Sequence, residues 1–494
     1  MPTQLPPEPE TPAPAASAAV TAPNPETPGD CVPFIQKAAY GAGGITENLA
    51  NSLTQQMINP VFNIGLGISP TILGFVLMIY RCYDAFADPI IGNISDNTRT
   101  RWGRRRPFIV GGGILTGLTF PLIWQARAEW GHAFIIGYMI VVGLIFYTAF
   151  STWAMPYYSL GMEMTPDYDE RTRVVAYRAF FSAFVGLVSG WLMALISLPF
   201  FAGGIVGKPD LVVGMRHVGW LIGGIILLVA ILPGLFVRER YYEKEARNQP
   251  KIGLIRGFKE TLRCRPFLLV IGIVVVQGLG YGIVGSLGLY LNIYYVFQGD
   301  VQSASVIEGI KSTACFLPGM LSVPFWTWAS QRFGKNASLA ATLVMGMVAN
   351  AAMFFCYTPA HPYLQIIPSL LMSAFGYGIW MLAPSMQADI VDYDEYHTKE
   401  RREGSFSAVF SWSLKFSGTL CAGLSGLIIV WSGFDVEKYG KHQPRGVMLT
   451  MLSWYSFVPL IFCAIALILL KFYPLNRKRM HEIRADLEKI RGKV

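Results

Sequence analysis

The sequence predicts an all-α membrane protein in which twelve transmembrane helices form two bundles of six. Composition supports this first: 53% of the 494 residues are hydrophobic and only 14% are charged, whereas an average soluble protein is about 25% charged. The other two supports are a series of long apolar segments and a repeat that relates the two halves of the chain. A large soluble enzyme is therefore excluded.

Segments of about 20 apolar residues mark helices that cross a bilayer. Twelve spans are expected at residues 36–66, 70–96, 107–127, 132–158, 173–200, 215–236, 266–296, 304–331, 337–357, 364–393, 404–432 and 447–471. The first span is the least apolar, because "ENLANSLTQQMIN" carries Glu47, Asn48 and Gln55. A helix this polar is expected to face only protein or a water-filled cavity.

Basic residues mark the cytoplasmic side of these spans. The net charge is +9, and Lys and Arg gather in loop 97–106, in loop 237–265 and in the tail from residue 472. The positive-inside rule therefore predicts that both termini are cytoplasmic in a multi-pass plasma-membrane protein, which in a bacterium means the inner membrane. The same clustering fits contact with the lipid bilayer and not a nucleic-acid partner.

The basic loop also divides the chain into domains. Residues 34–236 and 266–472 are the two expected bundles, and residues 237–265 are a cytoplasmic linker. Residues 1–33 are rich in Pro and Ala and lack the basic start and apolar core of a signal peptide, so a disordered tail is expected. Residues 473–494 are expected to form a cytoplasmic C-terminal tail.

Two motifs recur at matching places in the two halves. "DYDE" begins at Asp167 and again at Asp392, each time between the fourth and fifth span of its half. "RWGRRRP" from Arg101 has a weaker counterpart in "RFGKN" from Arg332, each time after the second span. Parallel repeats of six helices are typical of the major facilitator architecture.

Two carboxylates lie inside the second span, in "YRCYDAFADPIIG". Arg81, Asp84 and Asp88 are spaced i, i+3, i+7 and therefore share one helical face. A charge at the bilayer centre costs at least ~2.5–3.5 kcal/mol, and two ionised carboxylates one turn apart repel unless a cation or a shared proton intervenes. The pattern indicates a site for a coupling cation; the alternative is an ion-pair network that only holds the bundle together.

Other polar residues point to a substrate cavity between the bundles, expected to be lined by spans 1, 4, 5, 10 and 11. Lys415 is the only charge between Glu403 and Asp435, so pairing with one of the two aspartates is favoured over snorkelling to the surface. Arg178 lies two turns inside the fifth span and suits sugar hydroxyls. Aromatic rings for stacking are available nearby at Trp153, Tyr157, Tyr158, Trp380 and Trp412, although a single aromatic is more often a packing residue.

Charged clusters at the cytoplasmic ends of the helices predict a gate. Ion pairs at such positions can close the inward path and break when it opens; the alternative is that the charges only set the topology. The predicted gate residues are Arg101, Arg104, Asp167, Arg171, Arg173, Asp389, Asp392 and Glu395.

Motifs for chemistry on a substrate are missing from the sequence. It contains no nucleotide-binding loop, zinc-protease motif or nucleophile elbow, and its six His and seven Cys are scattered. Neither an enzyme nor an organic cofactor is expected. No metal site is certain, although Asp84 and Asp88 are candidate ligands of Na⁺.

One family combines these motifs. "YDAFADPIIGNISDNTRTRWGRRRP", and "ADIVDYDEY" followed by "SLKFSGT", resemble the glycoside–pentoside–hexuronide:cation symporters. The resemblance implies alternating access and symport of a sugar with H⁺, Na⁺ or Li⁺. It assigns the two aspartates to the cation, and it assigns Lys415, Arg178 and Trp380 to the substrate cavity.

The sequence departs from the family pattern at several of these positions. Glu47 and Asn48 stand where the family has an adjacent lysine and aspartate in the first span, and Tyr158 stands where the sugar site has a tryptophan. Glu47, Asn48 and Tyr158 are therefore expected to contact the substrate. Ser151 or Thr152 is expected to keep the role of a hydroxyl ligand for the cation.

The leading prediction is a cation-coupled sugar symporter that works as a monomer on a glycoside, pentoside or hexuronide. H⁺ is slightly favoured over Na⁺ as the coupling ion. Ala87 replaces an amide that the family offers to Na⁺, whereas a proton needs only one buried carboxylate. A lysolipid or other amphiphile carrier of the same fold is one alternative, and a non-transporting membrane sensor is another.

Overall fold

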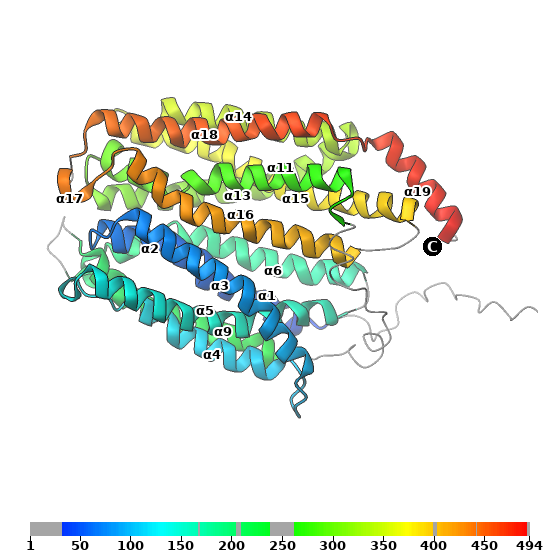
Figure 1. Ribbon diagram of the computed structural model, residues 1–494, viewed down its shortest axis with the longest axis horizontal. Coiled ribbons are helices and arrows are strands. Elements are labelled where there is room, and N and C mark those ends of the chain that lie inside the picture. The colour runs from blue at the N-terminus through cyan, green and yellow to red at the C-terminus, as the bar shows by residue number, and fades with distance from the viewer. Residues whose placement is uncertain are drawn as a thin grey trace, which may run out of the picture.

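The computed structural model describes residues 32–165, 168–203, 209–237, 261–398, 403–440 and 442–491. Within these ranges the chain is helical and contains no strand. The helices lie side by side in two bundles that are stacked in Figure 1, with the N-terminal half of the chain below and the C-terminal half above.

The first bundle contains the N-terminal elements. In chain order they are α1 (Phe34–Glu47), η1 (Asn48–Ser52), α2 (Leu53–Ile58), η2 (Asn59–Ile64), α3 (Pro70–Asn97), α4 (Arg106–Ile123), η3 (Ala128–Trp130), α5 (His132–Glu163), α6 (Tyr168–Ser189), α7 (Leu192–Ile196), α8 (Pro199–Ala202) and α9 (Leu211–Phe236). The run from α1 to η2 is continuous and forms the first span, with wider π-helical turns at η1 and η2. Such turns are frequent at functional sites.

The second bundle contains the C-terminal elements. In chain order they are α11 (Arg265–Val284), α12 (Leu287–Tyr290), η4 (Leu291–Val296), α13 (Val301–Phe333), α14 (Lys335–Cys356), η5 (Pro362–Gln365), α15 (Ile366–Thr398), α16 (Glu403–Trp431), α17 (Val436–Tyr439), α18 (Arg445–Lys471) and α19 (Arg477–Arg491). Its first span also ends in π-helical turns, at η4, which matches the position of η2 in the other half.

All twelve predicted spans coincide with helices. Among the described residues, nine helices are long and apolar enough to cross a membrane, three in the first bundle and six in the second. The remaining three spans are the run from α1 to η2, α3, and α6 with α7. They carry Glu47, Asp84, Asp88 and Arg178, so the predicted site residues contribute to their lower hydropathy.

Several helix starts follow from local chemistry. Pro70, Pro107 and Pro266 stand in the first turns of α3, α4 and α11, where a missing backbone N–H costs nothing. Asp210 accepts hydrogen bonds from two backbone N–H groups at the start of α9, and Asp300 does the same for α13, which satisfies donors that otherwise lack a partner.

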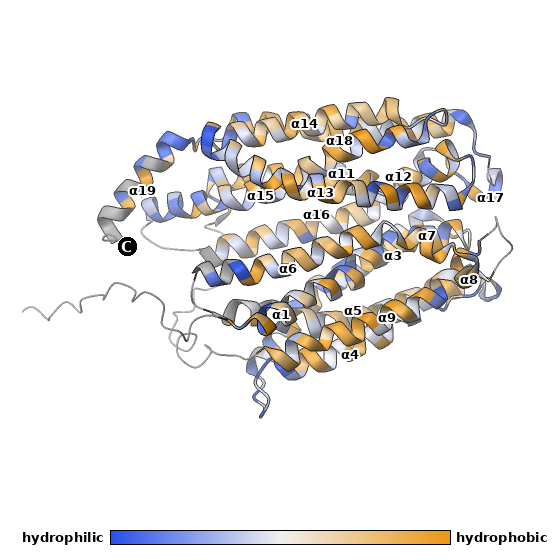
Figure 2. Cartoon of the chain, turned by 180° about the vertical axis from the view of Figure 1, so that it is seen from behind, coloured by the Kyte–Doolittle hydropathy of each residue, from blue (hydrophilic) through white to orange (hydrophobic). Residues whose placement is uncertain are grey.

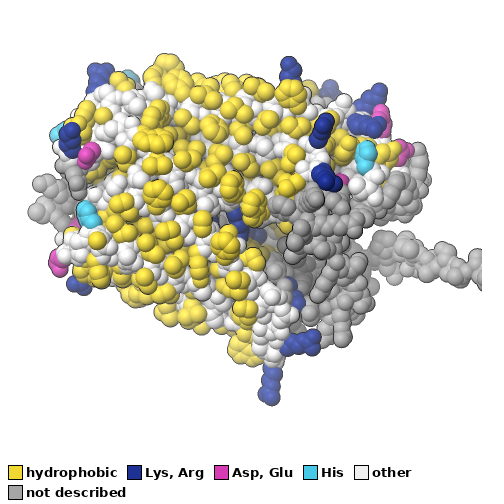
Figure 3. Space-filling model, viewed as in Figure 1, with side chains coloured by type: hydrophobic (Ala, Val, Ile, Leu, Met, Phe, Trp, Pro, Cys, Tyr) yellow, Lys and Arg dark blue, Asp and Glu magenta, His cyan; other side chains and the backbone are white. Residues whose placement is uncertain are grey.

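The polarity of the surface changes along the bundle axis. Apolar side chains cover the length of both bundles, whereas polar and charged residues gather at the two ends (Figures 2 and 3). This is the pattern of a protein whose middle is surrounded by lipid. The C-terminal segment, expected to be a tail, forms α19 at one end of the second bundle, where Met480, Ile483 and Leu487 are buried.

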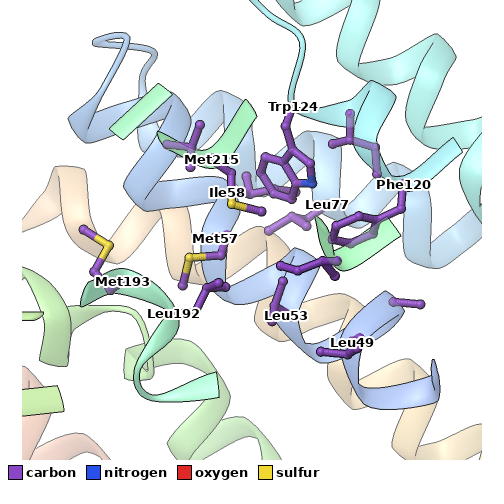
Figure 4. Packing of buried hydrophobic residues seen from close by; sticks show 14 of the residues in the cluster. Leu49, Leu53, Met57, Ile58, Leu77, Phe120, Trp124, Leu192, Met193 and Met215 are labelled. Atoms are coloured by element: carbon purple, nitrogen blue, oxygen red, sulfur yellow. The ribbon is translucent and has the colours of Figure 1, made fainter. Parts of the chain in front are cut away.

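The two bundles are sealed together at the end opposite the basic loops. One hydrophobic cluster contains residues of both bundles at that end, including Phe62 and Tyr290; Figure 4 shows its portion around Met57, Trp124 and Met193. A second cluster lies only in the second bundle, around α11, α15, α16 and α19. The hydrophobic core is therefore continuous between the bundles at one end.

Polar contacts and close backbone approaches complete this seal. The Tyr290 hydroxyl donates to Asn63 Oδ1 at 2.7 Å, and the Ser312 hydroxyl donates to the Gly186 carbonyl at 2.9 Å. A Cβ at Gly426 would clash with the carbonyl of Pro70. Because α16 and α3 come this close only with a glycine at the contact, the packing is specific to this arrangement.

Candidate functional site

The two predicted cation aspartates lie together in the interior of α3. Asp84 and Asp88 are only 8% and 6% exposed. The Ser151 hydroxyl donates to Asp84 Oδ1 at 3.0 Å, whereas Thr152 donates to the Thr148 carbonyl of its own helix at 2.7 Å. The structure thus brings Ser151, and not Thr152, to the aspartates.

Lys415 joins the aspartates from the other bundle. Its ammonium group on α16 forms an ion pair with Asp88 Oδ2, so this contact crosses the interface between the halves. Asp88 Oδ1 is buried and has no hydrogen-bond partner among the described residues. Arg81, on the same face of α3, makes no ion pair with either aspartate among the described residues, so Lys415 is the cation that pairs with Asp88.

The first and fifth spans contribute a second ion pair. Arg178 Nη2 lies 2.7 Å from Glu47 Oε2, and Arg178 Nε donates to the same oxygen at 3.1 Å. The Tyr158 hydroxyl donates to Glu47 Oε1 at 2.8 Å. Three of the predicted substrate residues therefore form one hydrogen-bonded unit. Asn48 lies next to it but donates its side-chain amide to the Gly44 carbonyl of its own helix.

An aromatic stack supports this unit from the side of α5. The rings of Tyr40 and Tyr157 stack with centroids 4.7 Å apart, and Tyr157 stacks on Trp153 at 4.6 Å. The guanidinium of Arg178 lies 4.9 Å from the centroid of Tyr158. The sequence predicted aromatic residues near Arg178 but did not indicate that Tyr40 joins the aromatic stack. In the first span, only the polar residues had suggested a function.

Two adjoining cavities lie between the bundles. The larger, of about 920 Å³, is lined from spans 1, 7, 8 and 11 among others, and by Trp380 of span 10. The smaller, of about 820 Å³, is lined by Glu47, Asn48, Arg178 and Trp380. Spans 1, 5, 10 and 11 line these cavities as predicted, and spans 2, 7, 8, 9 and 12 are additions. Span 4 is absent from the described linings, and its Tyr158 contacts the lining residue Glu47.

One ion pair in the larger cavity was missed by the sequence analysis. Glu308 and Lys311 both line this cavity, and Lys311 Nζ lies 2.8 Å from Glu308 Oε1. Two opposite charges at i, i+3 inside an apolar span were the available signal. Trp412, by contrast, is 54% exposed and stacks on Phe416; it lines neither described cavity.

The predicted gate residues lie at the end that carries the basic loops. Arg173 lies 3.3 Å from Glu170 of the same helix, and Lys335, from the "RFGKN" motif, lies 2.7 Å from Asp389. Both pairs join residues of one bundle. Arg101 is exposed, Arg104 is buried, and Asp392 and Glu395 are half-buried; Asp167 and the side chain of Arg171 fall outside the described residues. A gate between the bundles stays a prediction.

Fold and site together define a multi-pass membrane transporter of the major facilitator class. A family model described as MFS/sugar transport protein matches residues 39–477, and the chain belongs to this family. The family consists of transporters for small molecules and not of enzymes, which agrees with the predicted architecture.

Individual relatives are distant but match along most of their length. The glucuronide carrier protein homolog of Escherichia coli is 24% identical over 91% of this chain and 94% of its own. The sodium-dependent lysophosphatidylcholine symporter 1 of Gallus gallus is 24% identical over 86% of this chain and 83% of its own. A solved D-xylose–proton symporter superposes with a TM-score of 0.57 and 14% identity, over 89% of this chain and 96% of that one, which shows a shared fold.

Proposed function

We propose that this protein is a cation-coupled sugar symporter that works by alternating access. The observation that carries the proposal is the ion pair between Lys415 and Asp88, which joins the two bundles beside the cavities. A charge pair across this interface links the relative position of the bundles to the charge state of the aspartates. The family's sugar transport and the E. coli glucuronide carrier homolog support a sugar as the substrate class.

Coupling follows from competition for Asp88. Without a bound cation, Lys415 neutralises Asp88, because a buried carboxylate without a partner is costly. A cation at Asp84 and Asp88 removes the need for this ion pair and frees α16 to move relative to α3. Sugar and cation therefore affect the same interface, and each binds more tightly when the other is present.

A proton is the favoured coupling ion. Na⁺ needs a shell of several oxygens, and Asp84, Asp88 and Ser151 supply only part of one, with Ala87 in place of a further ligand. A proton on one carboxylate is sufficient to break the pair with Lys415. The test is sugar uptake into membrane vesicles under an imposed pH gradient or an imposed Na⁺ gradient at matched potential. Stimulation by Na⁺ alone at constant pH would overturn the choice of ion.

The bundle contacts favour an inward-facing state. The seal around Tyr290, Asn63 and Gly426 lies at the end opposite the basic loops, and the positive-inside rule makes the basic end cytoplasmic. We place the protein in the bacterial inner membrane with both termini in the cytoplasm. Function as a monomer remains part of this proposal.

An amphiphile carrier is the second candidate. The smaller cavity lies against α6 and α13, where Val175, Leu187 and Phe316 provide an apolar lining, and the Gallus gallus relative is named for lysophosphatidylcholine. Uptake of radiolabelled methyl glycosides and of lysophosphatidylcholine into the same proteoliposomes separates the two. Saturable sugar uptake without lysolipid uptake supports the sugar symporter, and the reverse result replaces it.

A further inference from the structure

The ion pair of Glu308 and Lys311 lies inside the second bundle, where charges do not contribute to membrane topology or to solubility. Lys311 is 8% exposed, and besides Glu308 its ammonium group donates to the Tyr357 hydroxyl at 3.2 Å. Glu308 Oε1 also accepts a hydrogen bond from the side-chain amide of Asn292. Asn292 in η4 and Lys311 in α13 therefore hold the Glu308 side chain directly, and Tyr357, which follows α14, holds Lys311.

The arrangement leaves one carboxylate oxygen for a ligand. Both hydrogen bonds to Glu308 fall on Oε1, and the side chain keeps 26% of its surface exposed while lining the larger cavity. Oε2 is therefore the atom available to accept a hydrogen bond from a molecule in this cavity. Lys311 is already used by Glu308 and Tyr357, so it positions the carboxylate.

The two cavities adjoin each other and together make up the ligand space. Ser312, Cys315 and Trp380 line both of them. Glu308, Ser312 and Cys315 follow each other at i, i+4 and i+7, which places them on one face of α13. Each bundle therefore presents a carboxylate to this space: Glu47 from the first bundle and Glu308 from the second.

Charge balance in this space limits the substrate. Among the described residues, the charged side chains that line the two cavities are Glu47, Arg178, Glu308 and Lys311. Each cation forms an ion pair with a carboxylate of its own bundle, so the lining has no net charge and no unpaired cation. A ligand carboxylate would find no unpaired cation to neutralise it, whereas sugar hydroxyls would find two strong acceptors.

We propose that Glu308, positioned by Lys311, is a substrate-binding residue, and that the cavity selects neutral glycosides over hexuronides. The inference rests on the proposed sugar transport and narrows its substrate class. It assigns the second bundle a direct part in sugar binding, in addition to the part that Lys415 plays in coupling.

Matched sugars provide the test. The probes are the methyl β-glycosides of glucose, galactose, xylose and arabinose, together with the methyl β-glycosides of glucuronate and galacturonate, which differ from glucose and galactose only at C6. Affinities are measured by isothermal titration with the full chain in lipid nanodiscs. The expected wild-type result is at least about tenfold tighter binding of a hexoside than of its uronide.

Variants separate a binding role from a structural one. Glu308→Gln leaves Lys311 without its counter-charge and replaces a carboxylate acceptor by an amide, so the hexoside-to-uronide ratio should fall about tenfold. Glu308→Asp keeps the charge and should preserve the ratio while weakening hexoside binding. Tyr357→Phe removes a contact of the same network outside the cavity lining, and should lower the melting temperature without changing the ratio.

The outcomes distinguish the two proposals. Binding of none of the six sugars overturns the sugar symporter and this inference with it. Sugar binding with a wild-type preference for the uronide, or a ratio that Glu308→Gln leaves unchanged, overturns the inference alone. If Glu308→Gln does not fold, hexoside binding that Glu308→Asp weakens no more than Tyr357→Phe does overturns it as well.

Discussion

The two bundles have the same number of helices but differ in where they hold charge. Among the described residues, three helices of the first bundle and six of the second are long and apolar enough to cross a membrane. The polar spans of the first bundle carry Asp84, Asp88, Glu47 and Arg178. The second bundle contributes Lys415 and the pair of Glu308 and Lys311 from helices that remain apolar elsewhere.

This difference indicates that the two bundles have different roles in transport. In our proposal, the first bundle holds the cation carboxylates and one sugar-binding carboxylate, and the second bundle responds to the charge of the cation carboxylates through the ammonium group of Lys415. Charged residues in a bilayer are expensive and are retained where they function. Changes in the first bundle should therefore abolish coupling or binding, whereas changes at the contacts between the bundles should only shift the conformational equilibrium.

The largest expected effect is at the cation carboxylates. Asp84→Asn or Asp88→Asn should abolish accumulation of sugar against a gradient, while downhill exchange survives, because sugar binding does not need both charges. Ser151→Ala should weaken cation dependence, and Thr152→Ala should not, since Thr152 bonds its own helix. Concentrative uptake in vesicles measures all four. Accumulation by the double aspartate variant would make these residues structural.

A smaller loss is expected at the sugar-binding pair of the first bundle. Arg178→Lys removes the multiple hydrogen bonds to Glu47, and a lysine does not reproduce their geometry. Because hydrogen bonds to charged groups contribute about 1.5–3 kcal/mol, KM for sugar should rise roughly 10–100-fold. Initial rates of uptake under a fixed gradient check this. An unchanged KM would place sugar binding elsewhere.

The seal between the bundles provides a conformational test. Gly426→Leu introduces a side chain against the Pro70 carbonyl and should destabilise the sealed end by about 1–3 kcal/mol, as overpacking does. A cysteine introduced at Ser312 should then react faster with an impermeant reagent added outside. Gly446→Leu is the matched control, since nothing lies near a Cβ there. Equal labelling in both variants would argue against a seal at this end.

The smallest effect is expected at the basic-loop end. Asp389→Asn removes an ion pair with Lys335 that is present in the inward-facing structure, so it should disfavour that state by about 1 kcal/mol or less, the usual range for a partly exposed pair. Cysteine accessibility from the cytoplasm reports the shift, with Glu482→Gln in the exposed pair with Arg479 as the control. Identical labelling would leave membrane topology as the role of these charges.

Long-range patterns made most of the fold predictable. Apolar runs identified the twelve spans, the repeated "DYDE" motif indicated two halves, and charges inside apolar runs identified Asp84, Asp88 and Lys415. Family resemblance directed attention to Arg178 and Trp380, and both line the smaller cavity. Isolated charges in a span are informative because, inside a bilayer, a charged side chain almost always faces the protein interior or a water-filled cavity.

Details that depend on helix rotation were not predictable. Ser151 and Thr152 are adjacent, so their side chains point about 100° apart around the helix, and only packing decides which one faces Asp84. Glu308 and Lys311 neutralise each other within one span and were overlooked for that reason. The helix α19 was read as a tail because its charge outweighs the few apolar residues that dock it, Met480, Ile483 and Leu487.

The most direct test of coupled transport is whether sugar entry carries protons with it. Purified protein is reconstituted into weakly buffered liposomes without any imposed gradient, and a neutral methyl glycoside is added outside while the external pH is recorded. The account predicts that the external pH rises as sugar and protons enter together, and that Asp84→Asn with Asp88→Asn removes the response. Sugar entry with no pH change, and with no dependence on Na⁺, would contradict cation coupling.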